Sequence, residues 1–538
     1  MGRGIWQQGR GILGTAEIIE EKTGGNLVIS ADFGTSSVKV AVVDSNFKVV
    51  ARAIETYPLE LPRPGFAEQN PEDWWQALCR ATANLAAQVP DLADKTGALV
   101  FCAQMSAVVA IDAAGDVLRP CLVCVDKRSA DISQKLIGGF PSFEGYQIAK
   151  IARWIRLANG APSKNGVDPI GKMLWIKQHE PEVFAKTAKF LDVKDWLCLR
   201  ASGVMSTGAD SANLTWLMDT RRGKEGWSQD LSKRVGIPLD KLAPIVNGSD
   251  VLGPLTAQAA VDLGLNSGTK MVAGGSDVSA TALGAGLSED GEVVICASTS
   301  AWISAFLPKR MLNIGGSYAT ITSSVDFRPL VAASQETAGS AIDWAARMLN
   351  EGMDETASMP ASFFEDCGAP EADDPYFLPW LAGERVPVDN ERLRGAFVRL
   401  ALHHDRTTMK RAVLEGVAQN LGWAFSKVVR EKGIDKVGPV QLVGGLALVP
   451  EFAQMMADTL DRPMVVGDPR FVGILGAATM AAPAVGWAPT VWDAVVQLRE
   501  KPNRRFDPIP ARVALARARS KNLQKIRKTM INLYANID

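Results

Sequence analysis

Histidine is scarce in this chain, which has 538 residues but only His179, His403 and His404. A catalytic triad built on histidine, or a histidine-rich metal site, is therefore disfavoured. Long apolar runs are missing too, since no stretch approaches the ~20 residues that a membrane-spanning helix needs. The residues before Leu27 lack the apolar segment of a signal peptide, although Ala16–Thr23 indicates a short helix.

Cysteine and net charge are also low. Seven scattered cysteines form no disulfide framework, so reduced thiols and a cytoplasmic location are expected. Cys121-Leu-Val-Cys124 has no second Cys/His pair at ligand spacing, which favours a structural role over zinc or redox chemistry. The formal net charge of −1 gives no indication of nucleic acid or an anionic membrane as partner. The length predicts more than one domain.

Two β-branched segments around a small polar turn stand out at Leu27–Asp44. The pattern predicts two strands joined by Gly34-Thr35-Ser36-Ser37, with Asp32 in an apolar strand just before the turn. The N–H groups and hydroxyls of such a turn suit a phosphate, and a neighbouring carboxylate suits Mg²⁺. An ordinary hairpin in which Asp32 caps its own turn is the alternative that this stretch leaves open.

A second hairpin of this kind, Val293–Leu307, lies in the other half of the chain, where Ser298-Thr299-Ser300 aligns with Gly34-Thr35-Ser36. The repeat predicts a duplicated domain. Shortly before it, an apolar strand from Met271 runs through two glycines into Asp277 and a helix of small residues. Asp277 is thus either a helix N-cap or a general base displayed at a strand end.

Polar residues follow other predicted strands as well. Ala98–Ala103 ends at Gln104-Met105-Ser106, Cys121–Val125 ends at Asp126, and Val440–Val443 ends at Gly444-Gly445. Strands with such ends indicate a mixed α/β sheet whose loops carry the chemistry.

Two other features are assigned no binding role. Gly166–Lys172 nearly matches a phosphate-binding P-loop, but Met173 stands where that motif needs Ser or Thr, and no buried strand precedes it. The residues past Pro508 form a basic helical tail, for which a solvated capping helix is favoured over a nucleic-acid surface.

Taken in order, these landmarks resemble the FGGY family of carbohydrate kinases, and within it the xylulokinase-like branch. The matching stretches lie between about Leu27 and Val485 and include ADFGTSSVKVAVVD, GFAEQNPEDWW, AQMSAVVAID, VAGGSDVSATALGAG, PWLAGERVP and LVGG. The resemblance implies an α/β fold of two ribonuclease-H-like domains of the actin/Hsp70 ATPase type with an interdomain cleft. The parts expected are an N-terminal extension (1–26), a sugar-binding domain (27–285), a nucleotide-binding domain (286–508) and a helical tail (509–538).

The resemblance also implies an enzyme that transfers the γ-phosphate of ATP, with Mg²⁺, to a hydroxyl of a ketose such as xylulose. Asp277 would be the catalytic base and would contact both the sugar and the metal, while Asp32 would hold Mg²⁺. The other residues implied are Gly34, Thr35, Ser36, Ser298, Thr299, Gly444 and Gly445 for the nucleotide, and Gln104, Met105, Ser106 and Asp126 for the sugar. No nucleic-acid or membrane partner is expected, and a homodimer is left open.

Four positions depart from the family pattern. Ser106 replaces the histidine of Gly-Gln-Met-His-Gly, and Cys124 replaces a tryptophan two residues before the acid Asp126. These two changes leave the sugar open. Ser298 and Leu446 stand where glycine is usual, and a Cβ limits how closely the backbone approaches a phosphate.

Three alternatives remain at this point. The first is a kinase of another ketose or a polyol. The second is a non-catalytic or chaperone-like ATPase of the same architecture, against which Asp277 argues because a pure nucleotide switch needs no sugar-facing base. The third is a sugar-binding regulator that has lost catalysis.

Overall fold

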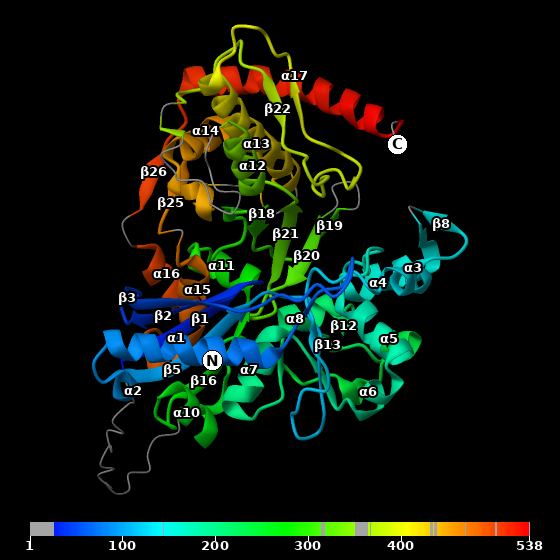
Figure 1. The fold of residues 1–538 in the computed structure, drawn as a ribbon, viewed down its shortest axis with the longest axis vertical. Coiled ribbons are helices and arrows are strands. Elements are labelled where there is room, and N and C mark those ends of the chain that lie inside the picture. The colour runs from blue at the N-terminus through cyan, green and yellow to red at the C-terminus, as the bar shows by residue number, and fades with distance from the viewer. Residues whose placement is uncertain are drawn as a thin grey trace, which may run out of the picture.

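The computed structural model describes residues 26–143, 145–313, 318–349, 364–365, 367–430, 434, 438–468, 470–500 and 503–536. The predicted extension over residues 1–26, with its helix at Ala16–Thr23, therefore lies outside the described residues except for Asn26. Figure 1 shows a mixed α/β architecture with two large sheets, one in each half of the molecule. Among the described residues, no helix combines the length and apolar character needed to cross a bilayer.

The first sheet has six strands in the order β15-β16-β5-β1-β2-β3. β1, β5 and β16 run parallel, whereas the other pairs are antiparallel. Every residue of β5 is buried, as expected for a central parallel strand covered on both faces. The bounds are β1 (Leu27–Phe33), β2 (Ser37–Asp44), β3 (Val49–Thr56), β5 (Thr96–Ala103), β15 (Val251–Pro254) and β16 (Lys270–Ser276).

The second sheet repeats this plan in the order β19-β20-β21-β18-β17-β24-β25-β26. The strand pairs β21–β18 and β18–β17 are antiparallel, β17–β24 and β24–β25 are parallel, and β25–β26 is antiparallel. The first sheet, read from β3 to β15, shows the same sequence of pairings. The duplication predicted from the two hairpins is therefore confirmed. The bounds are β17 (Val293–Ala297), β18 (Ala301–Ala305), β19 (Leu312–Asn313), β20 (Tyr318–Thr322), β21 (Pro329–Gln335), β24 (Val440–Val443), β25 (Met464–Val466) and β26 (Arg504–Phe506).

Helices cover both faces of the first sheet. One face packs on α1 (Pro71–Gln88), α7 (Val193–Ser202) and α10 (Ala257–Leu263). α1 begins with Pro71 at its first position, and Asn70 caps it by accepting a hydrogen bond from the Glu72 N–H. The other face packs on α11 (Asp277–Gly284) and α15 (Val472–Ala481), and α16 (Val491–Arg499) joins the same apolar core by packing on α15.

This second face joins the two halves of the chain. α15 and α16 belong by sequence to the predicted nucleotide-binding domain, yet α15 packs on the first sheet and α16 packs on α15. Ser30 Oγ in β1 donates a hydrogen bond to the carbonyl oxygen of Ile474 in α15 at 2.8 Å. The boundary at residue 285 stays a prediction, because one apolar core contains residues from both sides of it.

The second sheet carries α12 (Gly339–Leu349), α13 (Arg406–Val428) and α14 (Pro450–Leu460). The basic tail forms α17 (Pro510–Tyr534), which lies across this end of the molecule in Figure 1. Arg519 of α17 pairs with both carboxylate oxygens of Glu415 in α13 at 2.6 Å, and Leu523 is buried. The tail therefore caps the second half, as predicted.

A separate group of helices fills the chain between β5 and β15. It contains α3 (Ala130–Ile137), α4 (Ile148–Ala158), α5 (Pro169–His179), α6 (Pro181–Lys186), α8 (Ala209–Leu214) and α9 (Gln229–Val235). Several of these helices surround their own apolar cluster, which includes Trp154, Ile170 and Leu231. The strand predicted at Cys121–Val125 is shorter than expected, since β7 covers only Cys121–Leu122.

α11 and α15 meet backbone to backbone. A Cβ added at Gly476 of α15 would lie 1.7 Å from the carbonyl oxygen of Ala280 in α11, and one added at Gly284 would lie 1.8 Å from that of Val472. Only glycine permits this approach, because any side chain would force the two helices apart.

We expect Gly476→Ala to lower the free energy of unfolding by about 1–3 kcal/mol or more, because the added methyl group overpacks this contact. Gly268→Ala is the matched control, since a Cβ there would meet no atom within 4 Å. That variant should change the free energy of unfolding by no more than about 0.5 kcal/mol. Urea unfolding measures both, and equal effects would contradict the packing argument.

Candidate active site

Three parallel strands of the first sheet end at the same edge. Asp32 in β1 is in register with Cys102 in β5, and Cys102 is in register with Gly275 in β16. Asp32 therefore lies beside Cys102 on the adjacent strand. Gln104 follows the end of β5, and Asp277 follows the end of β16. This edge gathers the carboxylates and the amide that the sequence places after separate strands.

The end of β16 is shaped by a bulge. The register with β5 shifts between Val272 and Gly275, and Gly274 has a φ of +67°. A Cβ at Gly274 would lie 2.0 Å from the carbonyl oxygen of Phe101. Only glycine fits there, so the bulge depends on Gly274. The bulge in turn sets the direction in which the end of β16 leads into Asp277.

Helix α11 is capped by Ser276, whose side chain accepts a hydrogen bond from the Ser279 N–H at 3.2 Å. The buried carboxylate of Asp210 accepts bonds from the Ser276 N–H at 2.6 Å and from Ser279 Oγ at 3.0 Å. The capping alternative for Asp277 is therefore wrong. Asp277 is the first residue of the helix, and its side chain retains an exposed surface.

The pKa values of Asp32 and Asp277 are both raised. Burial raises the pKa of Asp32 above its ordinary value, although Lys39 and a hydrogen bond with Cys102 act in the opposite direction. Desolvation by the surrounding protein, followed by the negative charge of Asp32, raises the pKa of Asp277 to about 7. Two carboxylates with raised pKa values at strand ends on either side of β5 are typical of a catalytic or cation-binding position.

The first predicted phosphate turn joins β1 to β2 and is linked to the end of β5. Thr35 Oγ1 donates a hydrogen bond to Gln104 Oε1 at 3.3 Å. Gln69 Nε2 donates to the carbonyl oxygen of Thr35 at 2.7 Å, and Gln104 Nε2 donates to Gln69 Oε1 at 3.1 Å. Gly34 and Thr35 are half-buried and Ser36 is exposed, so the turn remains accessible.

The second predicted turn lies at the corresponding edge of the second sheet. β17 and β24 are parallel, which brings Ser298 and Thr299 beside Gly444 and Gly445. The carbonyl oxygen of Ser298 accepts a hydrogen bond from the Gly339 N–H at 2.7 Å. Ser298, Thr299 and Gly445 are exposed, whereas Gly444 is buried.

The loop after β5 is held by charges beneath it. Ser106 has a φ of +70°, and its N–H donates a hydrogen bond to Asp192 Oδ2 at 3.1 Å. The fully buried ammonium of Lys172 donates to the carbonyl oxygens of Ser106 and Val123, each at 2.7 Å. Met105 and Ser106 are half-buried, so this loop presents their side chains on a fixed backbone.

Asp126 has a more internal position than its predicted contact with sugar suggests. Its side chain is fully buried, and Oδ2 accepts a hydrogen bond from the Ala67 N–H at 2.7 Å. Arg128 Nε donates to both carboxylate oxygens at 2.9–3.0 Å. This placement favours a role in holding the surrounding loops together, and a direct contact with sugar stays a prediction.

Comparison with known proteins shows the family to which the chain belongs. Residues 27–284 match the N-terminal domain of the FGGY family of carbohydrate kinases, and residues 294–485 match its C-terminal domain. The chain belongs to this family. It is therefore a carbohydrate kinase, an enzyme that transfers a phosphoryl group.

Individual relatives carry more than one name. A xylulose kinase of Bacillus subtilis (strain 168) is 30% identical over 517 residues, which cover 95% of this chain and 96% of the relative. A gluconokinase of the same strain is 27% identical over 466 residues, or 85% and 88% of the two chains. The crystal structure of a gluconate kinase from Lactobacillus acidophilus shares the fold, with a TM-score of 0.83 at 23% identity over 95% of this chain and 99% of that one.

The sequence did not indicate that Lys172 and Asp192 support the site of this FGGY kinase. The rejection of Gly166–Lys172 as a P-loop agrees with the structure, because Pro169 begins α5 and Lys172 lies inside that helix. Burial lowers the pKa of Lys172 and raises that of Asp192 to about 7. The one available signal was Lys172, an ionisable residue among apolar residues of a helix. Its partners are backbone carbonyl groups far away in the sequence, which no residue type marks.

A histidine cluster lies away from these strand ends. Among the described residues, Asp373, His403 and His404 form the one group of His, Cys, Asp and Glu side chains whose potential ligand atoms lie within 4.8 Å of one another. Arg399 Nη2 donates a hydrogen bond to Asp373 Oδ1 at 2.9 Å. Since a guanidinium already neutralises that carboxylate, we assign no metal to the cluster.

We expect Asp277→Asn to stabilise the protein above pH 7. The folded state holds the Asp277 proton up to a pKa of about 7, whereas the unfolded chain releases it near 3.8. The wild type therefore loses stability from this group as the pH rises from about 4 to about 7, and Asn removes that loss. The difference in free energy of unfolding between variant and wild type should be largest at pH 8 and smallest at pH 4.

Chemical denaturation at the two pH values tests this expectation. Asp240→Asn is the matched control, because Asp240 is an exposed carboxylate in the turn Leu239–Lys241. A variant that is destabilised at pH 8, or a difference that does not change with pH, would contradict the assigned electrostatics.

Proposed function

We propose that this enzyme transfers the γ-phosphate of ATP to a hydroxyl group of a ketose such as xylulose, with Mg²⁺ bound at the first sheet. The observation that carries the proposal is the placement of Asp32 and Asp277 at the ends of β1 and β16, on either side of β5. A phosphoryl transfer needs charge neutralisation, alignment and a positioned nucleophile, and these strand ends offer groups for each.

Asp277 is the proposed general base. In the protein without a bound cation its pKa is about 7, so a substantial fraction is ionised at neutral pH and able to accept the proton of a sugar hydroxyl. Its exposed surface at the start of α11 leaves it accessible to a substrate. Because Ser276 and Asp210 fix the helix start, the carboxylate is held in one position.

Asp32, together with Asp277, is the proposed holder of Mg²⁺. Hard cations prefer oxygen ligands, and the two carboxylates raise each other's free energy when both are ionised. A divalent cation between them would remove that repulsion, so the residues fit the metal. When bound, Mg²⁺ would neutralise charge on the phosphates of the nucleotide.

The proposed nucleotide site uses both sheets. Gly34, Thr35 and Ser36 would contact the phosphates from the first sheet, and Ser298 and Thr299 from the second. Gly444 and Gly445, beside the second turn, would border the adenosine. Two turns on different sheets can contact one nucleotide only if the halves of the enzyme form a cleft that closes, which would also exclude water as an acceptor.

The sugar is proposed to lie at the loop after β5, near Gln104, Met105 and Ser106. Gln104 is buried and accepts hydrogen bonds from Thr35 and, at 3.4 Å, from Cys124 Sγ, so both family departures near the sugar border this loop. The relatives differ in the substrates that their names give. Another ketose or a polyol therefore remains the second candidate for the substrate.

Other assignments are proposed with less detail. A cytoplasmic location is supported by seven cysteines that are all free. A homodimer is proposed from the family resemblance alone. A non-catalytic or chaperone-like ATPase, or a regulator without catalysis, is disfavoured because Asp277 keeps the position and the raised pKa that a base requires.

Asp277→Asn should lower kcat by about 10²–10⁴, the usual effect of removing a general base, while the affinity for ATP stays close to that of the wild type. Asp32→Ala should instead raise the Mg²⁺ concentration needed for half-maximal activity, because it removes a proposed metal ligand. A coupled ADP-release assay across Mg²⁺ concentrations separates the two. Near-normal turnover of Asp277→Asn would refute its role as base.

The second candidate, in which the wild type prefers another ketose or a polyol, predicts that Ser106→His raises kcat/KM for D-xylulose relative to that preferred substrate. Histidine tolerates the left-handed backbone at this position and restores a hydrogen-bonding ring near the sugar. Ser106→Ala is the matched control, since it removes the hydroxyl without adding a ring. If the wild type had its highest kcat/KM with D-xylulose in a panel of sugars, the specificity argument would be contradicted.

A further inference from the structure

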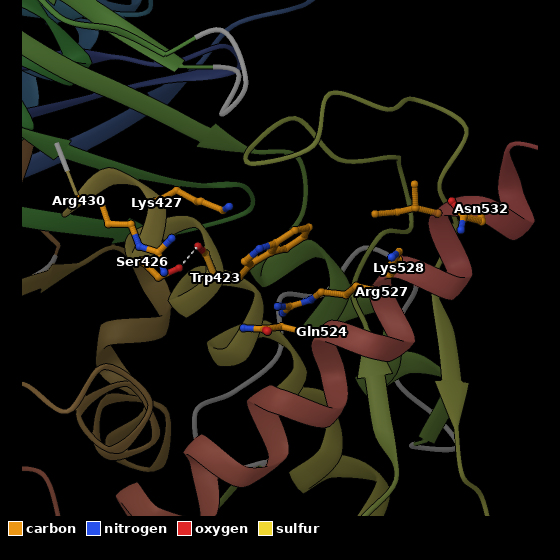
Figure 2. A pocket seen from close by; sticks show the side chains of 9 residues that line it. Trp423, Ser426, Lys427, Arg430, Gln524, Arg527, Lys528 and Asn532 are labelled. Atoms are coloured by element: carbon orange, nitrogen blue, oxygen red, sulfur yellow. Dashed lines mark hydrogen bonds between the residues drawn. The ribbon is translucent and has the colours of Figure 1, made fainter.

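A hollow of about 380 Å³ lies between α13 and α17, the capping helix of the second half. We call it the α13–α17 hollow. Figure 2 shows Trp423 and Lys427 extending from α13 toward α17, and Gln524 and Arg527 extending from α17 toward α13. The volume falls within the range of small-molecule sites. None of the residues that carry the predicted chemistry of the first sheet lines it.

The lining of this hollow is strongly cationic. Lys427, Arg430, Arg527 and Lys528 line it, and no lining residue is acidic. None of these four cations forms an ion pair within the part of the chain that the structure describes. Four like charges in one hollow repel one another and create a positive potential, which favours the binding of an anion.

Earlier residues of the same helix are arranged differently. Arg517 pairs with Asp461 at 2.5 Å, and Arg519 pairs with Glu415. These arginines have carboxylate partners supplied by the second half of the protein. The contrast shows that α17 is docked by ion pairs along its first part, whereas the cations around the hollow are left without such partners.

Arg527 provides the second, independent observation. It is only 2% exposed, and its guanidinium lies 4.4 Å from the centre of the Trp423 ring. Nη2 donates a hydrogen bond to the carbonyl oxygen of Gln419 at 2.8 Å, whereas Nε and Nη1 have no hydrogen-bond partner among the described residues. Buried N–H groups of a cation are seldom left without partners, because their desolvation is unfavourable.

No carboxylate in the described structure compensates Arg527 by direct contact. Burial lowers its pKa to about 9, with Glu384 acting in the opposite direction, so it remains charged at neutral pH. Glu384 is itself engaged elsewhere, since Oε2 accepts from Asn420 Nδ2 at 2.6 Å and Oε1 from the Arg385 N–H at 2.9 Å. A ligand with negative charge would supply what the protein does not.

We propose that the α13–α17 hollow binds a small phosphorylated anion through Lys427, Arg430, Arg527 and Lys528. A phosphate group offers several acceptor oxygens and more than one negative charge, which suits lysines and arginines that converge from two helices. Trp423 and Gln524 would border the rest of the ligand. This site is separate from the proposed catalytic site, so the proposal does not depend on which substrate the kinase phosphorylates.

Isothermal titration of the full-length enzyme with inorganic pyrophosphate, in the absence of Mg²⁺, tests the proposal. The test variant is Lys427→Gln with Lys528→Gln. The matched control is Lys521→Gln with Lys525→Gln, which removes the same charge from exposed positions of α17 that do not line the hollow. We expect affinity to fall about tenfold or more in the test variant, because two charge-assisted contacts are lost, and to stay within about twofold in the control.

Ribose 5-phosphate and a single-stranded oligonucleotide form two further arms. Binding of either small phosphate with loss only in the test variant supports the proposal, and their relative affinities distinguish an inorganic from an organic phosphate. Equal affinity in both variants would overturn it, because binding would then lie elsewhere, including at the ATP site. Absence of binding to the wild type, an equal loss in both variants, or preference for the oligonucleotide would overturn it as well.

Discussion

Two buried carboxylates at strand ends on either side of β5, where the charge of one acts on the other, constrain the first half of this kinase. Burial raises the pKa of both Asp32 and Asp277, and the charge of Asp32 adds to the effect on Asp277. A core selected for stability alone would not keep such a pair. The bulge at Gly274 and the buried Asp210 hold Asp277 in place despite this repulsion, so the surrounding structure compensates for a locally unfavourable arrangement.

The sequence predicted the parts of the fold that depend on local patterns. Apolar, β-branched runs around small polar turns indicated both hairpins. The end of a strand is also a local feature, so Asp32, Gln104 and Asp277 could be singled out before their register was known. Their shared edge follows from parallel pairing, which brings together segments that are far apart in the chain.

Other parts of the site could not be predicted, for physical reasons. Lys172 acts on backbone carbonyls, which every residue possesses, so no residue type elsewhere in the chain marks its partners. Asp126 follows a predicted strand as Asp277 does, yet Arg128 and the Ala67 N–H bind its carboxylate in the interior. Strand-end position alone does not distinguish a carboxylate that faces a ligand from one that holds loops together.

The packing of α15 on the first sheet has a consequence for how the chain is made. Val28 and Val100 face a core that also contains Ile474 and Ala477, residues that leave the ribosome only after most of the second half has been synthesised. Until then, α11 alone of the three helices is available to this apolar face of the first sheet. The N-terminal half therefore cannot complete its core until α15 has been synthesised, near the end of the chain.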